Sequence, residues 1–84
     1  MKDKKEILKG SFHFGKLCCR YYLLEEEGRI YLLGEEEEKG VLIWKETLVF
    51  SEEERVFAEG FYSLLVKSRT CPRMMSELAE EILP

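Results

Sequence analysis

The ten residues Val-Leu-Ile-Trp-Lys-Glu-Thr-Leu-Val-Phe, numbered 41 to 50, run directly into Ser51-Glu52-Glu53-Glu54. Successive side chains of an extended chain alternate between its two faces. One face of this run therefore carries Leu42, Trp44, Leu48 and Phe50, and the other carries Val41, Ile43, Thr47 and Val49. Both faces are largely apolar, so the run predicts a strand. The charged pair Lys45-Glu46 indicates a bulge or the point where the strand leaves cover.

The residues after this run predict a helix. Ser51 can cap the first turn, Glu54 can reach back to the Ser51 amide, and three glutamates suit the positive end of the helix dipole. The apolar stripe of this helix is Val56, Phe57, Gly60, Phe61, Leu64 and Leu65. We expect the stripe to lie on one sheet face, with Gly60 allowing a close approach to a strand. A second, short helix is expected after Thr70-Cys71-Pro72, because proline is tolerated in a first turn.

Upstream of residue 41 the pattern predicts two more strands. One runs from Ser11, with a potential break at Gly15, to a turn over residues 25–28, and the next covers residues 29–34 before a longer turn over 35–40. The fold class is therefore α+β: a three-stranded antiparallel β-meander with one long and one short C-terminal helix on one face. The segment Ser11–Phe14 is a candidate for an extra N-terminal strand.

The domain organisation follows from length and composition. Eighty-four residues with 45% apolar side chains make one small domain, which we assign to residues 11–84, preceded by a flexible basic arm over residues 1–10. No apolar run reaches the roughly 20 residues that span a bilayer, and the N-terminus lacks the features of a signal peptide. Three cysteines, two of them adjacent, make a poor disulfide framework. We therefore expect a cytoplasmic protein without a membrane partner.

Charge is segregated along the chain. Residues 1–20 carry six basic and two acidic side chains, whereas residues 21–60 carry four basic and twelve acidic ones. Binding to phosphate needs a continuous basic surface. The acidic middle therefore argues against nucleic acid as a direct partner.

The residues that usually carry chemistry do not form a recognisable site. Cys18 and Cys19 lie on opposite faces of a strand and cannot both reach one ion, which leaves too few ligands for zinc. A nucleophilic pair of His13 with Cys18 or Cys71 lacks an orienting third group. The sequence carries no phosphate loop or dinucleotide motif. We therefore expect no enzyme activity, no metal site and no cofactor.

The expected function is non-catalytic protein binding. One helical layer covers only one face of the sheet, yet both faces are apolar, so the second face should bind a protein partner or, most simply, a second copy of the chain. The residues expected at this interface are Tyr22, Leu24, Tyr31, Leu33 and Trp44. The alternation alone leaves open which set of side chains faces the helices.

Two alternative surfaces use charge instead. Glu35, Glu36, Glu37 and Glu38 could form an acidic surface that imitates nucleic-acid phosphates. The protein would then be a small inhibitor, of anti-defence, anti-CRISPR or antitoxin type, that blocks a nucleic-acid-processing enzyme. A basic corner of Lys67, Arg69 and Arg73 between the two helices could bind an acidic partner segment.

The chain also resembles a known family over part of its length. The segment Tyr21-Tyr22-Leu23-Leu24-Glu25-Glu26-Glu27, the helix start at Ser51 and the Cys71-Pro72 break before Leu78-Ala79-Glu80-Glu81-Ile82 are similar to a family of small uncharacterised proteins of clostridial-type Firmicutes bacteria. The resemblance covers residues 16–83. It implies a small bacterial domain of unknown function and no particular activity.

Overall fold

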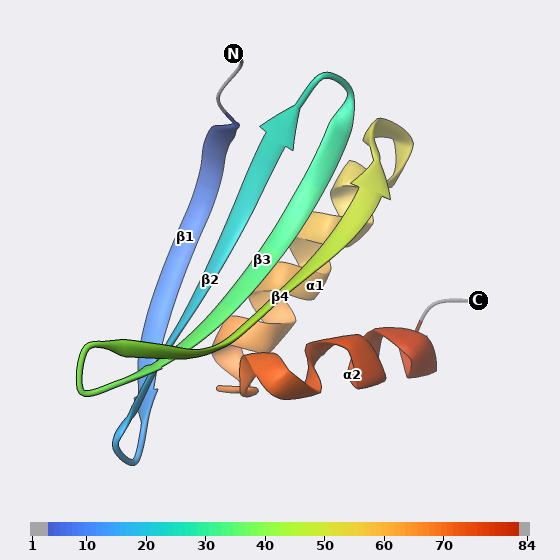
Figure 1. Cartoon of the computed structure of the whole chain (residues 1–84). Helices are drawn as coiled ribbons and strands as arrows, with labels where there is room; N and C mark the ends of the chain where they lie inside the picture. The colour runs from blue at the N-terminus through green and yellow to red at the C-terminus, as the bar shows by residue number, and fades with distance from the viewer. Residues whose placement is uncertain (1–3, 83–84) are drawn as a thin grey trace.

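The computed structural model describes residues 4–82 and shows a four-stranded antiparallel sheet followed by two helices (Figure 1). The strands are β1 (Lys5–Phe14), β2 (Leu17–Glu26), β3 (Arg29–Glu38) and β4 (Val41–Ser51), paired in the order β1-β2-β3-β4. A short 3-10 turn, η1 (Glu52–Glu54), leads into α1 (Arg55–Lys67), and a second, η2 (Pro72–Met74), leads into α2 (Met75–Ile82). The predicted α+β fold is confirmed, and the extra N-terminal strand is present.

The first strand is longer than the sequence indicated. Residues 5–10, which we had assigned to a flexible arm, form the first half of β1 and pair with β2, so that boundary was wrong. Ile7 packs against the core, and Gly10 lies opposite Tyr21 and close to the Tyr62 hydroxyl. Pairing and burial therefore order a segment that looks polar by composition. Residues 1–3 of the expected arm lie outside the described residues.

The turns between strands are shorter than expected. Glu27 and Gly28 have φ values of 45° and 78°, and Lys39 and Gly40 have 52° and 80°. Positive φ at two successive residues is typical of the tight hairpin turn that suits twisted strands. Because such a turn needs only two residues, the glutamates expected in the turns belong to strands: Glu25 and Glu26 to β2, and residues 35–38 to β3.

One face of the sheet holds the core. In Figure 1 neither helix crosses the sheet face toward the viewer, and α1 lies behind the sheet. The buried cluster joins sheet residues to both helices and comprises Phe12, Cys19, Tyr21, Leu23, Ile30, Leu32, Phe50, Ala58, Phe61, Tyr62, Leu65, Met75 and Ala79. Odd-numbered residues of β2 and even-numbered residues of β3 therefore face the helices, and their neighbours face the other way.

The helix begins where the sequence predicted, and its buried stripe matches the predicted one in part: Phe61 and Leu65 are buried and Phe57 packs against the core. The Ser51 amide donates to Glu54 Oε1 at 2.9 Å. The buried residues of α1 are Ala58, Phe61, Tyr62 and Leu65. Val56 is 82% exposed, and a Cβ added at Gly60 would have nothing within 4 Å, so the expected close approach at Gly60 was wrong. The close approach is at Gly34, where an added Cβ would lie 2.9 Å from Pro72 Cβ.

A bulge in β4 changes the alternation of its side chains. Glu36 lies opposite Trp44, but Glu37 lies opposite Leu42, so Ile43 is the extra residue. Residues on either side of a bulge no longer follow the simple alternation. Leu42 therefore shares the face of Glu37, whereas Trp44 shares the face of Glu36, and the bulge lies earlier than the charged pair Lys45-Glu46.

Candidate functional site

The sheet face opposite the helices carries a compact apolar cluster. Tyr22 lies directly opposite Leu33, and Leu24 lies directly opposite Tyr31, in successive rows across β2 and β3. All four side chains are partly exposed. The structure thus brings together four of the five residues that the sequence placed at an interface. We call this set, Tyr22, Leu24, Tyr31 and Leu33, the sheet-face cluster.

Trp44, the fifth residue, lies on the other face. It pairs with Glu36 in the ladder, and the Arg73 guanidinium lies 5.8 Å from its ring centroid. Its side chain is 40% exposed, at the helix side of β4. The sequence prediction for Trp44 was therefore wrong. Alternation groups Trp44 with Leu48 and Phe50, and only the pairing of β4 with β3 shows that this set faces the helices.

The strand register adds residues that the sequence analysis did not assign to this face. Val49, opposite Tyr31, is 55% exposed, and Thr47 lies opposite Leu33. Together with Lys4, Lys45 and three members of the cluster, Thr47 lines a hollow of about 220 Å³. Only the pairing of β4 with β3 reveals these neighbours, so hydrophobic patterning alone could not have found them.

Lysines border the cluster at the β1 edge. Lys4 Nζ lies 4.9 Å from the ring centroid of Tyr31, and Lys9 Nζ lies 5.6 Å from that of Tyr22. Such cation–π contacts contribute about 0.5–1 kcal/mol at exposed sites. The aliphatic stems of the lysines cover part of the aromatic rings while the ammonium groups stay in water.

A charged row lies beside the cluster on the same face. Arg20 donates from Nη2 to Glu37 Oε2 at 3.2 Å and from Nε to Glu35 Oε1 at 3.4 Å. The hydrogen bond to Glu37 is the main reason that the pKa of Arg20 is raised. Lys45 lies opposite Glu35 on β4. The face therefore combines an apolar half with a row in which the sign of charge alternates.

The prediction of an acidic surface over residues 35–38 was wrong for Glu36. Glu36 is fully buried on the helix side, where its carboxylate accepts hydrogen bonds from the Arg73 amide at 2.9 Å and from Arg73 Nη2 at 2.6 Å. Burial of a carboxylate is tolerated only when it is paired and hydrogen-bonded. Since Glu35 and Glu37 are paired with Arg20, these glutamates do not form one free acidic surface.

The ion pair between Arg73 and Glu36 also changes the predicted basic corner of Lys67, Arg69 and Arg73. Arg73 is bound to Glu36, and this contact raises the pKa of its guanidinium. Lys67 ends α1, and Arg69 follows it with a positive φ of 54°. Both are exposed, and the Arg73 side chain is half exposed, so all three predicted cations reach the surface while Arg73 also holds η2 to the sheet.

The described residues offer no obvious catalytic or metal centre. Cys19 is buried, and burial together with the nearby Cys71 raises the pKa of its thiol to about 12, which keeps it protonated and unreactive. No group of three or more His, Cys, Asp or Glu side chains within residues 4–82 is placed to hold a metal ion. No helix in this range is long and apolar enough to cross a membrane.

No family model matches the chain, and neither the curated proteins nor the solved structures include a significant match to it.

Proposed function

We propose that this chain is a non-catalytic protein-binding module that self-associates through the sheet-face cluster. The main support for this proposal is that the cluster lies on the two central strands of the sheet. Two adjacent cross-strand pairs of large side chains, Tyr22 with Leu33 and Leu24 with Tyr31, lie on the central strands of a face that neither helix crosses (Figure 1). Complete burial of a large apolar side chain from full exposure contributes roughly 1.5–3 kcal/mol, and these four partly exposed side chains would each contribute a part of that.

A second copy fits this face because the face is self-complementary. A twofold axis parallel to the strands, midway between β2 and β3, stacks β2 of one copy on β3 of the other. Residues that are opposite in the ladder then meet across the interface, so that Tyr22 meets Leu33 of the second copy and Leu24 meets Tyr31. The same operation sets Arg20 against Glu35 of the second copy. An isologous arrangement of this kind is the commonest in homodimers.

The size of the face is consistent with a specific dimer. Ten residues at roughly 3.3 Å each give a length of about 33 Å, and four strands about 4.8 Å apart give a width of about 19 Å. The flat area is therefore roughly 600 Å². Because side chains project from the sheet, the accessible area is larger than this flat area and approaches the roughly 800 Å² per partner that is typical of specific interfaces.

The inhibitor hypothesis has less support. A phosphate-imitating surface needs free carboxylates, but Glu36 is buried and Glu35 and Glu37 neutralise Arg20. The remaining carboxylates are distributed over several elements. For these reasons we propose self-association and do not develop the inhibitor role further.

A matched pair of lysine substitutions tests the proposal. Leu33→Lys places a charge in the centre of the cluster, whereas Val56→Lys places the same charge on exposed α1, away from the sheet face. The expected result is that Leu33→Lys reduces the mass of the particle to that of one chain in sedimentation, while Val56→Lys leaves it at that of two. Equal behaviour of the two folded variants would contradict self-association through this face.

A further inference from the structure

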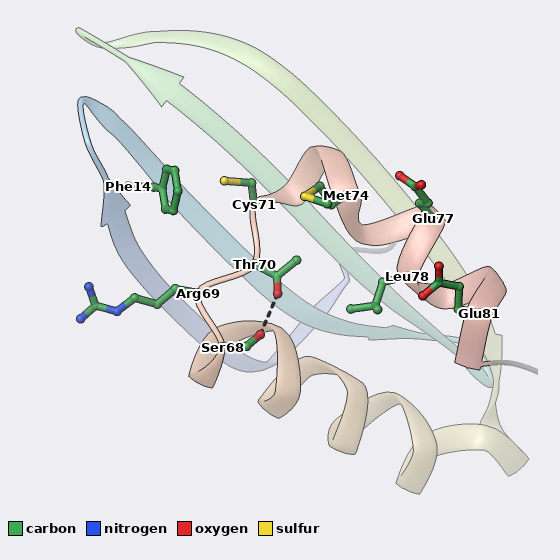
Figure 2. Close-up of a pocket in the computed structure, with 9 residues that line it drawn as sticks. All are labelled: Phe14, Ser68, Arg69, Thr70, Cys71, Met74, Glu77, Leu78 and Glu81. Atoms are coloured by element: carbon green, nitrogen blue, oxygen red, sulfur yellow. Dashed lines mark hydrogen bonds between the residues drawn. The ribbon is translucent and has the colours of Figure 1, made fainter.

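A second concave surface lies on the helix side of the molecule. Figure 2 shows a cleft between the end of β1, the loop after α1, and α2. Its volume is about 310 Å³, and its lining residues are Phe14, Ser68, Arg69, Thr70, Cys71, Met74, Glu77, Leu78 and Glu81. The floor is apolar and is formed chiefly by an aromatic ring, two sulfur-bearing side chains and a leucine. The cleft has the size and lining of a recognition site.

The loop wall of the cleft is held in place by hydrogen bonds. Tyr21 Oη donates to the Thr70 carbonyl at 2.6 Å, and the Thr70 amide donates to the Leu65 carbonyl at 3.0 Å. The Ser68 and Thr70 hydroxyls lie 2.7 Å apart, as the dashed line in Figure 2 shows. Because these hydrogen bonds lie within the chain itself, binding would require little ordering of the loop.

Arg69 marks one end of the cleft. It follows the last turn of α1 with a φ of 54°, and its amide donates to the Val66 carbonyl at 3.2 Å. At this position after a helix, glycine is the preferred residue because it adopts a positive φ without steric cost. Arginine therefore adopts a disfavoured backbone conformation here. Its side chain extends away from α2 (Figure 2), and no described residue forms an ion pair with it.

Two carboxylates mark the other end. Glu77 and Glu81 lie four residues apart on α2, so they are neighbours on the helix surface, and like charges at this spacing repel. No cation among residues 4–82 pairs with either of them. The cleft therefore has an unpaired positive charge at the loop, an apolar floor, and an unpaired pair of negative charges on α2.

From this arrangement we infer that the cleft binds a short segment of a partner protein in which apolar side chains lie between a basic end, placed against Glu77 and Glu81, and an acidic end, placed against Arg69. Charge complementarity at both ends defines this occupant. From Met74 to Glu81 the helix rises roughly 10 Å, which an extended segment of three or four residues spans. This surface is separate from the sheet-face cluster, so the inference goes beyond self-association.

The probe is a labelled hexapeptide, acetyl-Lys-Lys-Leu-Phe-Leu-Glu-amide, together with the peptide of reversed order. A control peptide of the same composition, Lys-Leu-Glu-Phe-Leu-Lys, lacks the separation of charge. Fluorescence anisotropy should show saturable binding of at least one of the two ordered peptides, with a Kd on the order of 100 µM. The control peptide should bind at least about tenfold more weakly.

The variants separate recognition from folding. Arg69→Gly removes the guanidinium but relieves the backbone, so the variant should fold at least as stably as the parent and bind the peptide about tenfold more weakly. Glu81→Gln should weaken binding similarly. Glu80→Gln, an exposed position of α2 outside the cleft lining, is the matched control and should have no effect.

Three outcomes would overturn the inference: no saturable binding of either ordered peptide, unchanged binding by the Arg69→Gly variant, or an equal loss of binding in the Glu80→Gln and Glu81→Gln variants. A change in the mass of the particle on Arg69→Gly substitution, without peptide binding, would instead assign the cleft to an interface between copies.

Discussion

Arg73 donates from its backbone amide, Nε and Nη2 to the buried carboxylate of Glu36, at 2.9, 3.0 and 2.6 Å respectively. This contact joins the start of the second helical segment to the C-terminal part of β3, across residues that are far apart in the chain. It also explains how a fully buried carboxylate is accommodated, since hydrogen bonds to an ionised group are among the strongest in proteins.

We predict that Arg73→Ala lowers the free energy of unfolding. Loss of one partner of a buried ion pair leaves an uncompensated charge, which costs about 3–5 kcal/mol when both partners are buried. The Arg73 side chain is half exposed, so water replaces part of the interaction, and the loss should be smaller than this but larger than that of an ordinary surface substitution. Urea unfolding measures this. A loss below about 0.5 kcal/mol, the level of an ordinary surface substitution, would show that the contact is not structural.

Gly34→Ala is predicted to be destabilising. An added Cβ would lie 2.9 Å from Pro72 Cβ and 3.0 Å from the Tyr21 ring, both of which are held within the core. Overpacking of this kind costs about 1–3 kcal/mol. Thermal unfolding of the variant should show a lower midpoint. An unchanged midpoint would mean that η2 moves away from β3 at no cost.

Gly60→Ala, by contrast, is predicted to be stabilising. The added methyl group would have nothing within 4 Å, and glycine inside a helix is less favourable than alanine by about 1 kcal/mol. Urea unfolding should show an increase of about that size. A decrease in stability would show that the surface of α1 at this position contacts something, such as a second copy of the chain.

Because the thiol of Cys19 is buried, we predict that the free energy of unfolding falls at alkaline pH. In the unfolded chain a cysteine ionises near pH 8.5 or so, whereas the pKa of Cys19 is raised to about 12 in the folded protein, first by burial. Above roughly pH 8.5 the unfolded state is therefore favoured by ionisation. The stability that the protonated Cys19 thiol contributes is fully present below this pH and is lost as the pH rises toward about 12.

To test this prediction, the free energy of unfolding of the parent and of a Cys19→Ala variant is measured near neutral pH and at about pH 10. The parent should lose more stability over this interval than a Cys19→Ala variant does. Burial also raises the pKa of Tyr21, so some alkaline loss should remain in the variant. If both proteins lose the same amount, Cys19 does not contribute to the pH dependence.

Local patterns in the sequence predict the order and type of most elements of this fold, but not the full length of β1 or β3. The alternation in residues 41–50 predicts β4, and the Ser51 to Glu54 spacing predicts the helix start within the first turn. Both signals act over a few residues, through side-chain alternation and backbone capping. The α+β class follows because the strands precede the helices in the chain.

The positions that depend on register could not be predicted in the same way. Glu36 and its neighbours look like a solvated turn by composition, but a two-residue turn at Lys39-Gly40 extends β3 and brings Glu36 to the face of Arg73. The bulge at Ile43 likewise decides the face of Leu42. In each case the outcome depends on pairing between strands, which no single strand encodes.

The sequence predicted only part of the candidate site, because alternation places residues within a strand but does not show how β4 pairs with β3. Tyr22, Leu24, Tyr31 and Leu33 lie on two paired strands without an intervening bulge, so simple alternation keeps them on one face. Trp44 alternates regularly with Phe50, and the register of β4 against β3 places both on the opposite face. Val49 is apolar and lies beside Tyr31, but only the register of β4 identifies it as a neighbour.

Self-association through the uncovered sheet face changes the mass of the protein in solution, which can be measured without altering the chain. Light scattering on a sizing column, over a dilution series of the unmodified chain, should give the mass of two chains at high concentration and a shift toward one chain only on dilution. The mass of a single chain at every concentration, up to roughly the millimolar range, would rule out self-association through this face.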